Sequence, residues 1–171
     1  MVVAADARHP GSPPSGDAVV TAESADVLTV VTADCASIAL GSPEGAFAAV
    51  HAGWRGLVAG VVEEAAAALR ALGATSVRGA LGPAIHAECY EFGAADLDVV
   101  AGRLGDGVRG ETTAGHPALD LPAAVAAALG RAGVEPVPGV DACTACGGPY
   151  YSHRARRDAG RQALVVWSAA A

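Results

Sequence analysis

Side chains able to do chemistry occur in four short segments of the sequence. The first segment, residues 32–35 (Thr-Ala-Asp-Cys), follows a β-branched run at 27–31 and places Asp34 beside Cys35. A cysteine at the end of a strand can act as a metal-binding thiolate or as a nucleophile, and it can also be an inert, buried small residue. Residue type alone leaves these three interpretations open.

Residues 51–56 (His-Ala-Gly-Trp-Arg-Gly) form the second segment, directly before a predicted helix. The start of a helix presents free N–H groups and the positive end of its dipole, so it favours an anion. Gly53 and Gly56 allow close backbone approach, and the Arg55 guanidinium suits phosphate or carboxylate. The structural alternative is that the histidine and tryptophan cap the core while Arg55 pairs with a surface acid.

The third and fourth segments contain the remaining cysteines. Residues 82–91 include His86 and Cys89, whose spacing could bind a metal, although a structural wall of a pocket fits this segment equally well. Cys143 and Cys146 form a single C-x-x-C motif, which without a second pair is a weak zinc or redox signal.

A cluster of arginines follows in an otherwise acidic chain. It comprises Arg154, Arg156, Arg157 and Arg161. Part of the cluster is expected to be an ordinary solvated face. Because arginine suits bidentate recognition of oxyanions, Arg154 and Arg161 are predicted to contact substrate.

The elements that must position these segments alternate between strands and helices. Hydrophobic patterns predict strands at 27–31, 46–50, 77–81, 137–140 and 162–167, and helices at 57–72, 94–104 and 122–131, the last with Pro122 at its first position. This alternation predicts an α/β or α+β fold in which mixed sheet layers are flanked by helices. We expect one domain over residues 1–171, with residues 1–16 as an irregular connector.

Composition excludes several classes of function. The chain has 171 residues with 18 acidic and 11 basic side chains, and all of the basic ones are arginine, so Schiff-base and P-loop lysines are excluded. A net charge of −7 argues against nucleic acid as a partner and favours a small-molecule substrate. No apolar run approaches the roughly 20 residues that cross a bilayer. The N-terminus has no secretion signal, so we expect a cytoplasmic protein with reduced cysteines.

Taken in order, these segments resemble the bacterial laccase-domain family. The matching motifs are Thr-Ala-Asp-Cys, His-Ala-Gly-Trp-Arg-Gly, Gly-Pro-Ala-Ile with Cys-Tyr-Glu, and Cys-Thr with Tyr-Ser-His-Arg and Gly-Arg, and the resemblance extends over residues 16–167. Members of this family are called multicopper polyphenol oxidases in older usage and purine nucleoside phosphorylases in newer usage.

The resemblance implies a zinc ion held by Cys35 and His51, with copper as the alternative metal. The implied activity is phosphorolysis of adenosine, inosine, guanosine and methylthioadenosine, together with hydrolytic deamination of adenosine. Cys35 and His51 are therefore expected to lie within metal-binding reach of each other. The zinc would lower the pKa of a water molecule that attacks purine C6, and we expect Asp34 to move the proton as a general base.

Phosphate is the second substrate that the resemblance implies. We expect Arg55 and the backbone at Gly53 and Gly56 to hold phosphate or the charge that develops on the leaving purine. The family's third metal ligand is a histidine in an upstream Gln-Val-His motif that this sequence does not contain. We therefore expect that the chain lacks a family segment before Met1 and that adenosine turnover is impaired. Three explanations stay open: a start codon placed too late, a true truncation, or His9 as the replacement ligand.

Three other functions remain as alternatives. Copper-dependent oxidation of phenols by a multicopper enzyme needs many histidines to bind several copper ions, and the five histidines of this sequence are too few for such a set. A cysteine hydrolase would use Cys35 as its nucleophile and His51 as its base, and it would keep its activity in the presence of a chelator. A non-catalytic, weakly metal-binding remnant is the third alternative.

Overall fold

The computed structural model describes residues 2–4 and 16–168 of the chain, with the backbone alone described for residues 2–4. The predicted connector between residues 5 and 15, including His9, lies outside the described residues. The strands are β1 (Val2–Ala4), β2 (Ala18–Thr21), β3 (Val27–Thr32), β4 (Ala36–Gly41), β5 (Phe47–Ala52), β6 (Arg78–Leu81), β7 (Arg109–Glu111), β8 (Pro117–Leu119), β9 (Glu135–Pro136) and β10 (Gln162–Trp167). The helices are α1 (Trp54–Ala59), α2 (Val61–Ala71), α3 (Ala94–Leu104), α4 (Leu121–Arg131) and α5 (His153–Arg156), with 3-10 turns η1 (Ala87–Cys89) and η2 (Asp106–Val108).

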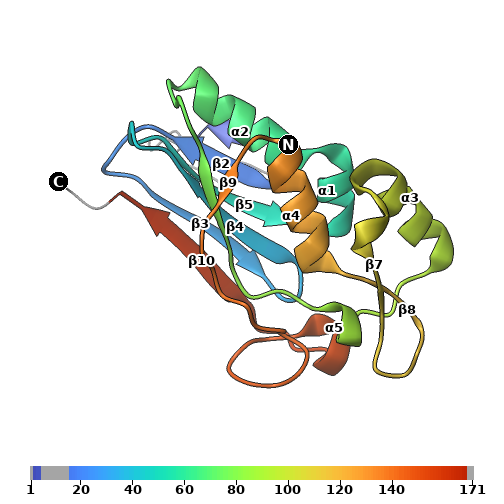
Figure 1. Ribbon diagram of the computed structural model, residues 1–171. Helices are drawn as coiled ribbons and strands as arrows, with labels where there is room; N and C mark the ends of the chain where they lie inside the picture. The colour runs from blue at the N-terminus through green and yellow to red at the C-terminus, as the bar shows by residue number, and fades with distance from the viewer. Residues whose placement is uncertain (1, 5–15, 169–171) are drawn as a thin grey trace.

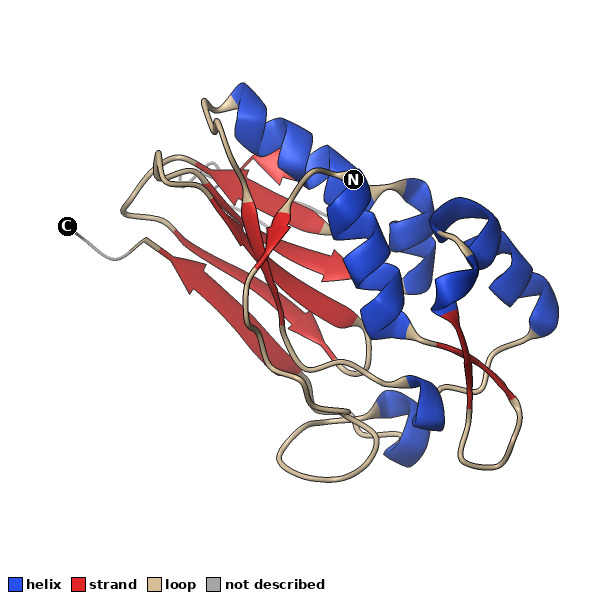
Figure 2. Cartoon of the chain, in the orientation of Figure 1, coloured by secondary structure: helices blue, strands red, loops and turns tan. Residues whose placement is uncertain are grey.

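A six-stranded sheet in the order β1-β2-β5-β4-β6-β9 forms the centre of the fold (Figure 1). Its pairings are mixed: β2, β5, β4 and β6 run antiparallel to their neighbours in that row, while β1 and β9 join the edges in parallel. The larger helices cover one face of this sheet (Figure 2). This arrangement confirms the predicted fold class of mixed sheet layers flanked by helices.

A two-stranded antiparallel ribbon, β3 with β10, packs on the sheet face opposite the helices. Alternate residues of β5 face the helices and the β3–β10 ribbon, because successive side chains of a strand point to opposite faces. Ala48 and Val50 belong to the core beneath the helices, whereas Phe47 and Ala49 pack with Leu28 of the ribbon. Since both faces are covered, β5 is a nearly continuous run of buried residues.

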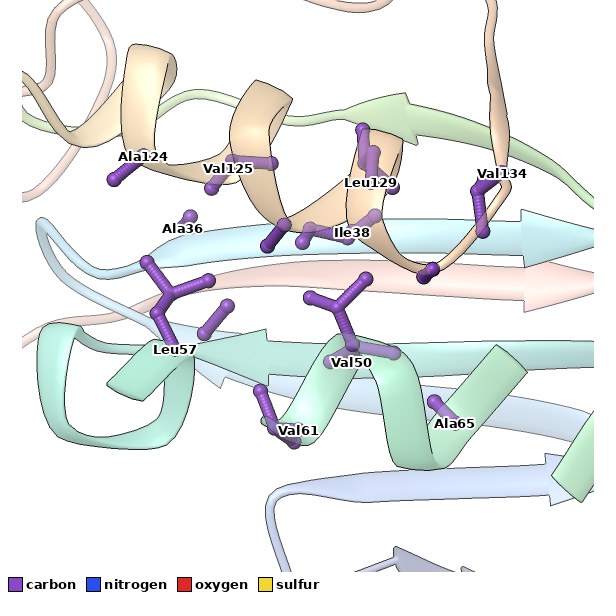
Figure 3. Packing of buried hydrophobic residues seen from close by; sticks show 14 of the residues in the cluster. Ala36, Ile38, Val50, Leu57, Val61, Ala65, Ala124, Val125, Leu129 and Val134 are labelled. Carbon is purple, nitrogen blue, oxygen red and sulfur yellow. The ribbon is translucent and has the colours of Figure 1, made fainter. Parts of the chain in front are cut away.

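The main core lies between the sheet and helices α1, α2 and α4 (Figure 3). Val125 and Leu129 of α4 point toward Ile38 of β4, while Leu57 of α1 points toward the same layer. Ile38 and Leu57 have no exposed surface, and burying such a side chain contributes about 1.5–3 kcal/mol. The buried alanines of β4 and β5 let these layers approach closely beneath the helices. No helix in the described part of the chain is long and apolar enough to span a bilayer.

The structure corrects the prediction of one helix over residues 57–72. Two helices, α1 and α2, occupy this stretch, and Gly60 separates them with φ 88° and ψ 30°. This left-handed conformation is one that glycine adopts without a Cβ penalty, and it ends α1 before α2 begins. Because α1 has only six residues, the predicted anion site cannot rely on the dipole of a long helix.

Three other predicted elements are also corrected. Residues 137–140 are not a strand; the strand is β9, just before them, and the prolines at 136 and 138 lack the N–H groups that would extend its ladder. Pro122 is the second residue of α4 rather than the first, since Asp120 caps the helix by accepting a hydrogen bond from the Ala123 amide. The connector predicted over residues 1–16 contains β1, which pairs in parallel with β2.

Candidate functional site

Cys35 and His51 lie side by side at one end of the main sheet. His51 is in β5 and pairs with Ser37 of β4, and Cys35 immediately precedes β4. A Cβ atom added to Gly53 would lie 3.3 Å from Cys35 Sγ and 3.8 Å from His51 Cε1, so both side chains border the same point. The structure therefore brings together the two residues to which the family resemblance assigns a metal, and a side chain at position 53 would crowd the thiol.

Asp17 holds the imidazole of His51 in place. Its Oδ1 lies 3.2 Å from His51 Nδ1. A carboxylate on Nδ1 leaves Nε2 as the nitrogen that can bind a metal, which is the usual arrangement of a metal-binding histidine. A hydrogen bond with the Cys35 thiol raises the pKa of His51, burial opposes this increase, and Asp17 adds to it. The groups around His51 thus favour positive charge at this point.

Asp34 connects three segments of the chain. It lies in the turn between β3 and β4 with φ 87°, a conformation that residues other than glycine seldom adopt. Its Oδ1 accepts a hydrogen bond from Thr144 Oγ1 at 2.7 Å, and its Oδ2 accepts one from the Arg154 backbone N–H at 2.7 Å. The Asp34 backbone carbonyl accepts a further bond from the Ile85 amide at 2.9 Å. These bonds give Asp34 a positioning role, while its role as general base stays a prediction.

A cavity of about 280 Å³ opens beside Cys35. The Arg154 guanidinium lies over the ring of Tyr90, with 5.0 Å between Cζ and the ring centroid. Burial raises the pKa of Tyr90, so its hydroxyl group keeps its proton at neutral pH. A cavity with arginines next to a thiol suits a ligand that carries an anionic group. Its lining comprises Ala33, Asp34, Cys35, Tyr90, His153, Arg154 and Arg157.

A second cavity, of about 610 Å³, shares Tyr90 and Arg154 with the first and reaches Trp54. Arg55, the second residue of α1, is not part of the lining of either cavity; its Cζ lies 4.3 Å from the centroid of the Trp54 ring. The contact that the structure gives for Arg55 is this stacking on the Trp54 ring. Phosphate binding by Arg55 therefore stays a prediction.

Two further predicted substrate contacts, Arg161 and the backbone at Gly56, stay predictions. Arg161 Nη1 donates to the carbonyl groups of Asp158, Ala159 and Gly160 at 2.8–3.1 Å, and it lines neither cavity. A Cβ atom on Gly56 would make an ordinary 3.5 Å contact with a valine side chain, so close packing does not require glycine there. Arg154 and Gly53 are the members of the predicted set that lie at the cavity and at the thiol.

Sequence reasoning missed Asp17 and Thr144 as members of the site. Thr144 lies between the cysteines of the C-x-x-C motif and is fully buried, so the motif marked the segment without showing that the hydroxyl matters. Asp17 precedes a short strand that the sequence pattern did not reveal, and no local signal links it to His51.

The fold and site define a class of protein: a mixed α/β domain with a thiol and an imidazole paired where two antiparallel strands meet. The profile of the family described as "Multi-copper polyphenol oxidoreductase laccase" matches residues 1–169. The chain belongs to this family, which confirms the resemblance found in the sequence.

The chain is similar in sequence to proteins named purine nucleoside phosphorylase. Purine nucleoside phosphorylase ORF3 of Streptomyces griseus is 41% identical over 157 residues, which cover 90% of this chain and 63% of that protein. Purine nucleoside phosphorylase Rv2149c of Mycobacterium tuberculosis is 40% identical over 154 residues, which cover 88% and 61% of the two chains. The chain thus spans less than two thirds of the length of these relatives.

Solved structures show the same fold. Neisseria meningitidis protein NMB0706 superposes with a TM-score of 0.84 at 30% identity, covering 99% of this chain and 71% of that chain. YlmD from Geobacillus stearothermophilus superposes with a TM-score of 0.80 at 30% identity, covering 91% and 62%.

Proposed function

We propose that this chain carries the metal site and part of the substrate site of a zinc-dependent purine nucleoside phosphorylase. The observation that supports the proposal best is the pairing of Cys35 with His51 beside a cavity that contains Arg154. The names of the relatives agree with this activity. Deamination of adenosine is proposed as a second reaction of the same site.

The donor atoms of Cys35 and His51 fit zinc. Thiolate sulfur and imidazole nitrogen are common zinc ligands, and the carboxylate of Asp17 fixes the histidine ring as such sites require. The same donors also suit copper, so the proposal for zinc rests on the relatives' named activity, which needs no redox change. Zinc bound there would supply Lewis-acid chemistry to the reaction.

The remaining residues of the site have proposed roles in binding and proton transfer. In phosphorolysis a phosphate oxygen attacks ribose C1′ while the C1′–N9 bond breaks, and the electron pair passes to the purine, which gains a proton. Arg55 and Arg154 would hold the phosphate and offset the charge on the departing base. Asp34 would keep the Arg154 backbone in place and accept a proton during deamination.

The direct test is to measure the release of hypoxanthine from inosine by this protein, with and without inorganic phosphate. Hypoxanthine release should depend on phosphate and should fall by about 100-fold or more in Cys35→Ser and His51→Ala, because even changes outside the ligand shell cost 10–100-fold. Asp98→Asn, on the exposed side of α3, is a matched control expected to keep the activity. Phosphate-dependent turnover that persists in Cys35→Ser and in chelator would refute the proposal.

Other outcomes of this experiment identify the alternative functions. Activity that survives chelation but is lost on alkylation of Cys35 would indicate a cysteine hydrolase. Zinc binding without turnover would indicate a non-catalytic protein. Multicopper chemistry has less support, because the close groups of three or more potential ligands within the described residues include no histidine.

A further inference from the structure

Three cysteines and a glutamate converge at a place that the proposed reaction does not use. Glu88 and Cys89 are the second and third residues of the 3-10 turn η1, while Cys143 and Cys146 come from the loop before α5. The candidate ligand atoms of these four residues all lie within 4.8 Å of one another. The loop and the turn are thus held together by a cluster of potential metal donors.

The distances match the spacing of ligands around a single ion. Cys89 Sγ lies 3.3 Å from Cys146 Sγ, and Cys146 Sγ lies 3.3 Å from Glu88 Oε1. Two sulfur atoms bound about 2.3 Å from a tetrahedral zinc lie about 3.8 Å apart. This separation is longer than the two 3.3 Å contacts and shorter than the 4.8 Å within which all four ligand atoms lie. Small movements of the side chains would therefore complete a tetrahedron.

The backbone around the cluster supports thiolate ligands. The His86 amide donates to Cys143 Sγ at 3.4 Å, and such a bond stabilises negative charge on sulfur. Arg156 donates to the carbonyl groups of Thr144 and Ala145 at 3.2 Å, so a cation also fixes the loop from its other side. Cys146 Sγ donates a hydrogen bond to Glu88 Oε1, so without a metal this thiol carries its proton, and a metal ion bound between these groups would displace that proton.

We propose that Cys89, Cys143, Cys146 and Glu88 bind one zinc ion as a structural site separate from the Cys35–His51 pair. Soft thiolates select zinc or copper(I) over harder cations, and a closed set of three sulfurs and one carboxylate is typical of structural zinc. Bound zinc would clamp the loop before α5 against the segment that carries Tyr90, and so would keep the wall of the substrate cavity in place.

Cobalt(II), used as a probe for zinc, distinguishes this site from the first one. In Cys35→Ser, which retains the cluster, one equivalent of cobalt should bind and give a thiolate-to-cobalt charge-transfer band. Adding Cys89→Ser or Cys146→Ser to that variant should weaken cobalt binding by about 100-fold or more, since loss of a ligand exceeds the 10–100-fold cost of outer-shell changes. Glu88→Gln in the same background keeps all three sulfurs and should retain the band with lower affinity.

The proposal is overturned if Cys35→Ser binds no cobalt, or if its band persists at full strength after Cys89→Ser. It is also overturned if mass spectrometry of protein kept under reductant shows a Cys89–Cys146 disulfide in place of free thiols. Hydrogen exchange of the wild-type protein gives a readout that does not depend on any variant folding: zinc should slow exchange in residues 143–150. These outcomes do not depend on the proposed catalytic activity.

Discussion

Replacement of Asp34 by alanine tests the packing of the site most directly. The carboxylate accepts two hydrogen bonds of 2.7 Å, from the Thr144 hydroxyl and the Arg154 amide. Each bond to a charged acceptor contributes about 1.5–3 kcal/mol, so the two together contribute about 3–6 kcal/mol. The buried Thr144 hydroxyl would lose its acceptor, and alanine would have to adopt φ 87° without a local polar side chain to favour it.

Urea unfolding followed by tryptophan fluorescence measures this loss. Asp34→Ala is expected to lower the free energy of unfolding by about 3–6 kcal/mol, and Thr144→Val, which removes only one of the two bonds, by about 1.5–3 kcal/mol. The double variant should lose less than the two single losses added together, because both variants remove the same bond. Asp98→Ala, which breaks an exposed ion pair with Arg109, is the control and should cost less than about 1 kcal/mol.

If the double variant loses as much free energy of unfolding as Asp34→Ala and Thr144→Val together, the proposed link between the turn and the C-x-x-C loop is refuted. A loss below about 1 kcal/mol in Asp34→Ala would show that neither hydrogen bond holds the site together.

Three further predictions concern the thiol, the phosphate contact and helix α5. Gly53→Ala should weaken zinc binding measured by calorimetry, because the new methyl group would lie 3.3 Å from the neighbouring thiol, whereas Gly56→Ala should bind zinc normally. Arg55→Ala should abolish the thermal stabilisation by phosphate, which reaches about 2.7 kcal/mol at 100 times Kd, and the exposed Arg78→Ala should retain it; equal shifts in the two variants would exclude a phosphate contact at Arg55. A backbone hydrogen bond at the start of α5 lowers the pKa of Asp158 from 3.8, so its contribution to stability is present above pH 3.8 and is lost as the pH falls through the folded-state pKa. An NMR titration that gives a pKa at or above 3.8 would contradict this prediction.

The sequence was most informative where side-chain periodicity was strong. Helix α3 (Ala94–Leu104) and strand β10 (Gln162–Trp167) have the predicted bounds, since each has a regular pattern of buried and exposed residues. Strand β4 (Ala36–Gly41) was not predicted, because its small residues lack a β-branched run. Cys35 is therefore followed by a central strand that the hydrophobic pattern did not reveal.

Partners across the fold were beyond the reach of local patterns. Residue types alone left the role of Cys35 open, and only the ordered motifs of the family linked it to His51. The register of β4 with β5 then placed the two side chains together. Asp17 remained hidden because its contact with His51 spans 34 residues and neither flanking segment marks it.

The hydrogen bonds of Asp34 also set the order in which the site can form during synthesis. Asp34 emerges early from the ribosome, but its two side-chain partners lie 110 and 120 residues further along the chain. Contacts so distant in sequence form late, because the ends of a long loop must meet before the contact gives any stability. The turn that holds Cys35 therefore gains its final support only after residue 154 has been made. A nascent chain that stops before this point would contain both Cys35 and His51 without the contacts that fix their surroundings, so the segment from Thr144 to Arg154 determines when the site becomes competent.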